Sequence, residues 1–186
     1  MLDIVKAPNP VLSQKAKKIA KTDKAVLKLI SEMEEALLAA TDPIGVGLAA
    51  PQVGKSLQLF IAKPTQKSKI LVFINPHIEK FEDKVDVKSK SAKGRSSSGR
   101  KLEGCLSLKD IWGEVARFDS VWLSYFDETG RNHHRRFDGF LATIIQHEID
   151  HLDGILFPKR VLEQKGTLYK SEKDEKGQDV FEEIKI

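Results

Sequence analysis

Two histidines and a glutamate stand within five consecutive residues, His147-Glu148-Ile149-Asp150-His151. Histidines at positions i and i+4 of a helix lie on one face and can bind the same metal ion. Phe140 and Ile144 fall on that face too, so the histidines and Glu148 are predicted to point into the protein interior. Burying a carboxylate and two imidazoles without a cation would be costly. We therefore interpret the pattern as a metal site and not as two helical histidines satisfied by their neighbours.

A hydrolytic metal site usually has three protein ligands and one open position. The zinc-protease pattern with a long spacer needs a third histidine at position 157, and Phe157 excludes it. Cys105 is the better candidate because it follows a glycine and precedes Leu106-Ser107, outside any apolar stripe. A downstream glutamate stays open as an alternative, in a charged segment expected to be exposed; the candidates are Glu163, Glu172 and Glu175.

The elements that position these residues follow from hydrophobic periodicity. Apolar residues at three- and four-residue spacing predict a helix over 22–41, capped by Thr22, and a second helix over 139–152. Residues 44–54 contain three glycines, which suits a backbone that turns sharply or closely approaches another group. Runs of β-branched and aromatic residues predict strands at 57–63, 69–76, 114–118, 120–127, 132–138 and 180–186. Asn75-Pro76 is expected to end the second of these strands. This order predicts an α+β fold.

Composition bounds the remaining possibilities. The chain has 186 residues, 40% of them hydrophobic, which predicts one folded domain over 1–186 with a charged tail from about 164. No apolar run approaches the roughly 20 residues of a membrane-spanning helix. The single cysteine excludes an internal disulfide and, with a start that carries no targeting pattern, predicts a cytoplasmic protein.

The positive charge is local. The chain carries a net charge of +4, and residues 84–101 hold seven Lys or Arg against one Asp, so the remainder is slightly acidic. We therefore expect no specific DNA binding by the fold as a whole. The segment itself is expected to be a flexible, solvated insertion, with contact to ribosomal RNA as the alternative.

Three motifs in order, IGVGLAAPQVG at 44–54, EGCLS at 103–107 and QHEIDHLDG at 146–154, resemble those of the peptide deformylases. The opening IVKAPNPVL is similar to that family's N-terminal segment as well. The resemblance implies mixed or antiparallel sheets packed around the central helix with the two histidines, and a second, N-terminal helix. It also implies removal of the formyl group from the N-terminal formyl-methionine of newly made polypeptides, with release of formate.

The resemblance assigns roles by position. Cys105, His147 and His151 would be the metal ligands, and Glu148 the general acid and base. Gln52 and the backbone N–H of Leu106 would stabilise the negative charge on the formyl oxygen, and Gly47 would align the substrate. Val46, Phe140 and Ile144 are the candidates for the pocket that holds the methionine side chain, from the motif and the helical face.

The cofactor implied by the resemblance is one divalent ion per chain, Fe²⁺ natively, with Zn²⁺, Ni²⁺ or Co²⁺ able to replace it. The partners would be formyl-methionine nascent peptides, with ribosome association through the basic segment. Lys109 and Thr143 depart from the family pattern, which usually has proline and an apolar residue there. Two other classes stay open: a zinc-dependent peptidase with a glutamate as third ligand, and an RNA-binding module whose closed metal site would use His77, His133 or His134.

Overall fold

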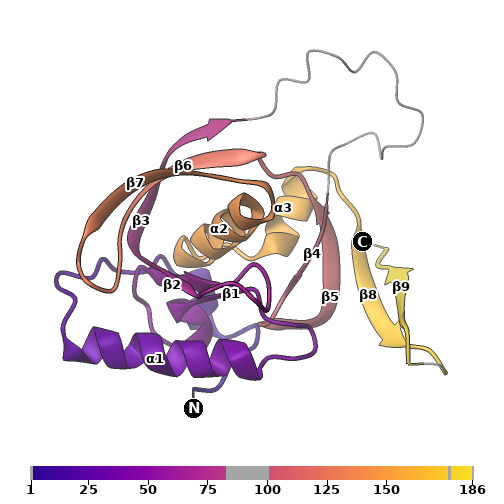
Figure 1. The fold of residues 1–186 in the computed structure, drawn as a ribbon. Helices are drawn as coiled ribbons and strands as arrows, with labels where there is room; N and C mark the ends of the chain where they lie inside the picture. Colours follow the sequence, from indigo (N-terminus) through magenta and orange to yellow (C-terminus); the bar gives the residue numbers. More distant parts are fainter. Residues whose placement is uncertain (1, 83–100, 176, 186) are drawn as a thin grey trace.

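The protein, analysed as a computed structural model, is described over residues 2–82, 101–175 and 177–185. Two antiparallel sheets enclose one central helix, and a second long helix closes the fold on one side (Figure 1). The helices are η1 (Pro10–Ser13), α1 (Lys24–Ala39), η2 (Ala50–Val53), α2 (Gly139–Leu152) and α3 (Phe157–Glu163). The strands are β1 (Gly47–Ala49), β2 (Leu59–Ala62), β3 (Leu71–Glu82), β4 (Lys101–Cys105), β5 (Leu108–Val115), β6 (Ser120–Phe126), β7 (Asn132–Asp138), β8 (Leu168–Lys173) and β9 (Asp179–Glu183).

The predicted α+β class is confirmed, and the basic insertion lies almost wholly outside the described residues. The larger sheet has the order β1-β2-β3-β6-β7. The prediction that Asn75-Pro76 ends a strand is wrong, because β3 continues to Glu82 across an irregularity in register between Ile74 and His77. Asn75 has a φ of 50°, and its side chain both accepts from and donates to the backbone of Ile19 at 2.8 Å, which compensates for the interrupted pairing.

The two long helices pack against this sheet with their apolar faces. Helix α2 has the predicted bounds and contacts β1, β2, β6 and β7, so it lies at the centre of the fold. Helix α1 buries Ile30, Met33 and Leu37 and packs on β1 and β2. Its cap is Asp23, whose carboxylate accepts from two backbone N–H groups, and not Thr22 as the sequence predicts.

The smaller sheet has the order β4-β5-β8-β9. The charged C-terminal segment supplies β8 as well as the predicted last strand, so residues 168–183 form a hairpin on the edge of β5. Leu168 joins the small core of Val115, Phe157 and Val161, which anchors the hairpin and α3 together.

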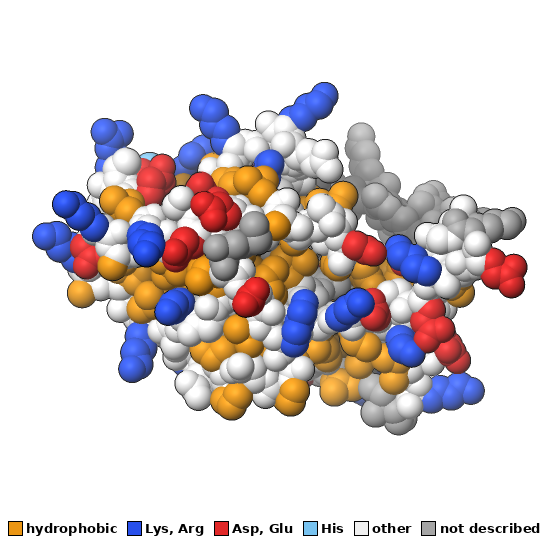
Figure 2. Space-filling model, turned by 90° about the horizontal axis from the view of Figure 1, so that it is seen from below, with side chains coloured by type: hydrophobic (Ala, Val, Ile, Leu, Met, Phe, Trp, Pro, Cys, Tyr) orange, Lys and Arg blue, Asp and Glu red, His pale blue; other side chains and the backbone are white. Residues whose placement is uncertain are grey.

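The face seen in Figure 2 shows no dominance of one charge. Lys or Arg and Asp or Glu side chains are interspersed over the face seen in Figure 2. Among the described residues, no helix has the length and hydropathy needed to cross a membrane.

Candidate metal centre and active site

The sole cysteine and the two helical histidines meet in the interior. Cys105 is the last residue of β4, and His147 and His151 lie one turn apart on α2. The ligand atoms of the three residues all lie within 4.8 Å of one another, and Cys105 Sγ is 3.2 Å from His151 Nε2. Among the described residues, these three form the one group of this kind, so the candidate glutamate ligands do not join it.

The site fits a divalent cation. The Nδ1 atom of His151 is buried and has no hydrogen-bond partner within the described residues, and neither has the Oε2 atom of Glu148. Burial opposes ionisation of the Cys105 thiol, but the adjoining His151 and His147 outweigh it and hold the pKa of the thiol well below its usual range. A thiolate with two imidazoles is a donor set that suits Zn²⁺ or Fe²⁺.

The two alternative ligand sets find less support. Glu163 forms an ion pair with Arg160 at 3.1 Å, and Glu172 one with Lys170 at 2.6 Å. His133 of β7 pairs with Asp127, which follows β6, and His134 of β7 pairs with Glu79 of β3. Neither histidine is part of the metal-ligand group.

A buried carboxylate fixes the orientation of His147. Glu103 accepts from His147 Nδ1 at 3.0 Å and from Arg117 at 2.9 and 3.0 Å. This bond leaves Nε2 of His147 to face the metal position. Burial opposes ionisation of Glu103, but His147 and Arg117 outweigh it and lower its pKa to about 2.

The charge network continues away from the site. Arg117 donates to Asp150 at 2.6 Å, and Asp150 accepts from Arg160 of α3 at 2.7 Å. The carboxylates of Glu103 and Asp150 thus hold Arg117 between β4 and α2. The sequence alone does not predict this network, because no local pattern pairs an arginine with acids 14 and 33 residues away.

Glu148 lies beside the ligands without being one of them. Its side chain is buried, and burial raises the pKa of the carboxyl to about 7 despite the nearby imidazoles. Such a group can both take up and release a proton near neutral pH. Gly47 of β1 faces it: a Cβ there would lie 2.9 Å from Glu148 Cδ and from Ile144 Cγ2, so only glycine leaves room.

Gln52 is held so that its amide points at the ligand group. The backbone N–H of Ala49 donates to Gln52 Oε1 at 2.8 Å, which leaves the Nε2 group directed at Cys105 Sγ at 3.5 Å and Ser107 Oγ at 3.4 Å. Leu106 follows Cys105 in the turn between β4 and β5. The two proposed donors therefore come from before and after Cys105 in the sequence, and both residues line the same cavity.

A cavity of about 280 Å³ opens onto these groups. The structure brings nine of the ten predicted site residues to its lining, with His151 buried behind it; they are Val46, Gly47, Gln52, Cys105, Leu106, Phe140, Ile144, His147 and Glu148. Phe140 is 53% exposed and forms the rim, whereas Ile144 is buried at the base. Thr143 also lines the cavity, so one wall of it carries a hydroxyl.

Known proteins resemble this chain over most of its length. Residues 1–166 match the model of the polypeptide deformylase family. The chain belongs to the peptide deformylase family. A peptide deformylase of Symbiobacterium thermophilum is 42% identical over 158 residues, covering 84% of this chain and 65% of that protein. Peptide deformylase 1 of Bacillus cereus is 38% identical, covering 87% and 92%.

Solved peptide deformylase structures share the fold. The enzyme of Synechococcus elongatus in complex with actinonin superposes with a TM-score of 0.73 at 36% identity, covering 86% of this chain and 78% of that one. The peptide deformylase of Thermotoga maritima gives 0.72 at 31% identity, covering 86% and 97%. Peptide deformylases are metal-dependent hydrolases that remove the formyl group from N-terminal methionine, so the family accounts for a buried metal-ligand group.

The close approach of Gly47 to Glu148 in this peptide deformylase gives a first prediction. We expect Gly47→Ala to lower kcat/KM for a formyl-methionine peptide by about 10²-fold or more, because the new methyl group displaces the carboxylate by about 1 Å. Gly130→Ala, in the turn that follows β6, is the control for glycine replacement. A Cβ there meets no described atom within 4 Å, but its φ of +79° makes alanine strained, so this variant should lose some stability and keep the wild-type kcat/KM. An undiminished rate in Gly47→Ala would contradict the placement of Glu148.

The support of His147 gives a second prediction. We expect Glu103→Gln to weaken metal affinity by about 10- to 100-fold, the usual cost of losing a partner of a metal-binding histidine. The cause would be loss of the charge that orients His147 and neutralises buried Arg117. Glu114→Gln, on the neighbouring β5, is the control. Equal metal affinity of the Glu103→Gln and wild-type proteins in a chelator competition would show that Glu103 does not position the ligand.

Proposed function

We propose that this chain hydrolyses the formamide of N-formyl-methionyl polypeptides at the Cys105, His147 and His151 group. The observation that carries the proposal is the convergence of these three side chains with Glu148 on a single cavity. The Glu148 carboxylate lies beside the metal-ligand group without being one of the ligands. This arrangement is typical of a hydrolytic metal site and not of a structural one.

Each residue has a part that follows from its position. Cys105, His147 and His151 would hold the cation, which when bound lowers the pKa of water and supplies a nucleophile at neutral pH. Glu148 takes up the proton released by the nucleophile and later gives it to the leaving amine. Its raised pKa favours this exchange.

The formyl oxygen gains negative charge during the reaction. The Nε2 group of Gln52 and the backbone N–H of Leu106 would donate hydrogen bonds to it, each contributing about 3 kcal/mol in a site that excludes water. The bond from Ala49 holds the Gln52 amide in place before substrate arrives. Val46, Phe140 and Ile144 would hold the methionine side chain, and Gly47 leaves room for the substrate backbone.

From the resemblance to the family, the resident metal is proposed to be Fe²⁺. Zn²⁺, Ni²⁺ or Co²⁺ could replace it, because one thiolate and two imidazoles accept all of them. The chain would act in the cytoplasm on nascent polypeptides. Ribosome association is proposed to depend on the basic residues of 84–101, whose charge suits sequence-independent contact with RNA phosphates.

Formate release separates this function from that of a peptidase. Anaerobically purified protein should release one formate per formyl-Met-Ala-Ser and leave the peptide bonds intact, as followed by mass spectrometry. The unformylated peptide is the control and should remain unchanged. Cleavage of Met-Ala-Ser, or cleavage of internal peptide bonds without formate release, would favour the zinc-peptidase alternative.

A further inference from the structure

The N-terminal segment contacts the backbone of both residues proposed to stabilise the formyl oxygen. The backbone N–H of Val5 donates to the carbonyl oxygen of Gln52 in η2 at 2.8 Å. The Nζ group of Lys6 donates to the carbonyl oxygen of Leu106, 100 residues further along the chain, at 2.6 Å. Two consecutive residues therefore connect η2 to the turn between β4 and β5.

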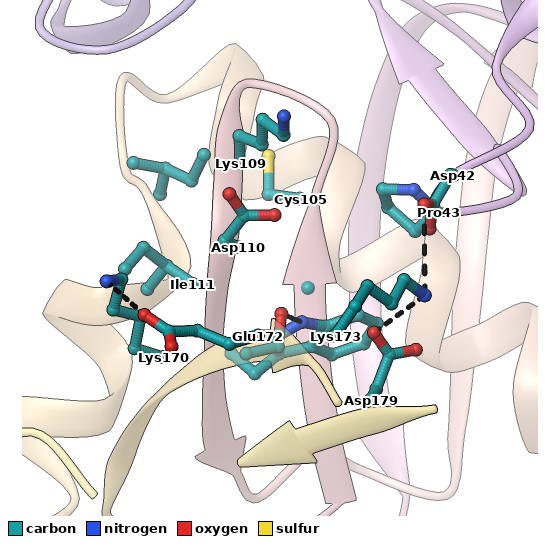
Figure 3. A pocket seen from close by; sticks show the side chains of 14 residues that line it. Asp42, Pro43, Cys105, Lys109, Asp110, Ile111, Lys170, Glu172, Lys173 and Asp179 are labelled. Carbon is teal, nitrogen blue, oxygen red and sulfur yellow. Dashed lines mark hydrogen bonds and ion pairs between the residues drawn. The ribbon is translucent and has the colours of Figure 1, made fainter. Parts of the chain in front are cut away.

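The turn that carries Leu106 adjoins open space on two sides. Cys105 pairs with Leu108, so Leu106 and Ser107 form the turn. Leu106 lines the active-site cavity. Cys105 and Leu108 line a second cavity of about 380 Å³, which Figure 3 shows with Cys105 and Lys109 among its side chains. Side chains therefore pack less closely on these two sides, and hydrogen bonds to the backbone of the turn matter more.

The N-terminal segment bonds to the carbonyl of each residue in this turn. Lys6 donates to Leu106, and the backbone N–H of Ala7 donates to the carbonyl oxygen of Ser107 at 3.0 Å. Ile4 and Leu106 also pack against the same hydrophobic core. Consecutive residues of the N-terminal segment thus hold the turn, and Lys6 bonds to the residue that carries the proposed N–H donor.

The bond from Lys6 acts on the direction of a group more than on the stability of the fold. Lys6 is exposed, so water can replace its bond and the net contribution to stability is small. The N–H and the carbonyl of Leu106 belong to one residue, so holding the carbonyl oxygen limits the directions in which the N–H can point. A donor stabilises developing negative charge only when it is aimed at the position that the oxyanion will occupy. Loss of the bond should therefore affect the transition state and leave the folded state unchanged.

We propose that Lys6 is a positioning residue for the hydrolytic reaction, and that its ammonium group keeps the Leu106 N–H directed at the formyl oxygen. The inference rests on the proposed function, which assigns the stabilisation of that oxygen to Leu106 and Gln52. Lys6 does not line the active-site cavity and acts through the carbonyl of Leu106. Val5 holds the backbone of Gln52 in the same way, so the N-terminal segment keeps the two donors at a fixed separation.

The kinetic test compares Lys6→Met with the wild type on formyl-Met-Ala-Ser. We expect kcat to fall by about fivefold to tenfold, which is less than the roughly 10²-fold loss caused by removing an oxyanion donor altogether. KM should stay within about twofold of the wild type, because an interaction made only in the transition state lowers kcat and kcat/KM equally. Bound metal and the melting temperature should equal those of the wild type. Lys6→Arg keeps a cationic donor and should retain about half of the wild-type kcat or more.

Lys15→Met is the matched control. Lys15 is another exposed lysine before α1, but it pairs with Asp153 at 3.3 Å and not with the turn, so its replacement should leave kcat unchanged. Lys6→Met should also keep the pH profile of the wild type, because the Lys6 bond does not involve Glu148. A wild-type kcat in Lys6→Met, or an equal loss in Lys6→Arg or Lys15→Met, would overturn the inference. So would a loss that accompanies a shifted pH profile or a lower melting temperature.

NMR spectroscopy of zinc-loaded, ¹⁵N-labelled protein tests the positioning without turnover. The order parameter of the Leu106 N–H should be about 0.85 in the wild type, as for rigid backbone, and should fall toward about 0.6 in Lys6→Met but not in Lys15→Met. An equal order parameter and an unchanged Leu106 amide shift in Lys6→Met would overturn the inference. Failure of the wild type to release formate, with the Leu106 N–H ordered through Lys6, would instead refute the proposed function.

Discussion

Cys105→Ala and His151→Ala are expected to lose the bound metal ion and to lower formate release by several orders of magnitude. Each change removes one of three ligand atoms that lie within 4.8 Å of one another, and two ligands from the protein are too few for tight binding. Without the ion, water keeps a pKa near that of bulk solvent, about 15.7, and is a poor nucleophile at neutral pH. Elemental analysis and a formate assay on the same samples measure both effects.

His77→Ala is the matched control for loss of a histidine. His77 is exposed on β3 and stands outside the metal-ligand group, so its replacement should leave metal content and activity unchanged. If Cys105→Ala bound one ion as tightly as the wild type does, the three-ligand site would be refuted. The glutamate of the peptidase alternative would then have to be sought in the C-terminal segment.

Glu148→Gln and Glu148→Ala are expected to keep the metal and lower kcat by about 10²–10⁴-fold, the usual contribution of a general acid or base. The carboxylate is buried, and its Oε2 has no hydrogen-bond partner within the described residues. Its neutral replacement should therefore leave the melting temperature equal or higher, which a residue with only a structural role would not do. Differential scanning calorimetry and metal analysis accompany the kinetics. A loss of less than tenfold, or a loss that follows metal content, would reject the role of Glu148 in proton transfer.

The central helix shows what a sequence can predict. The bounds of α2 and the inward face of His147, Glu148 and Ile144 follow from periodicity, because a buried helix keeps its apolar residues at fixed spacing. Periodicity does not predict that Cys105 joins the histidines, since it lies 42 residues before His147 and no local pattern links the two. That prediction comes from the resemblance of the three ordered motifs to those of the peptide deformylases.

The remaining features depend on contacts between distant residues. The sequence predicts that Arg117 is an ordinary strand residue, yet its side chain is buried between Glu103 and Asp150. Where β3 continues past Pro76, the Asn75 side chain forms two hydrogen bonds with the backbone of Ile19, which no propensity predicts. The C-terminal segment is exposed along β9, as its charged composition predicts. Its anchoring by Leu168 depends on the core that this residue joins, which the sequence does not show.

Metal titration with formate as the readout tests the central claim most directly. Protein stripped with a chelator under anaerobic conditions should release no formate from a formyl-methionine peptide. Activity should then rise in proportion to added Fe²⁺ and reach its maximum at one ion per chain. Formate release that does not depend on metal, or a protein that binds one ion per chain and releases none, would contradict the account.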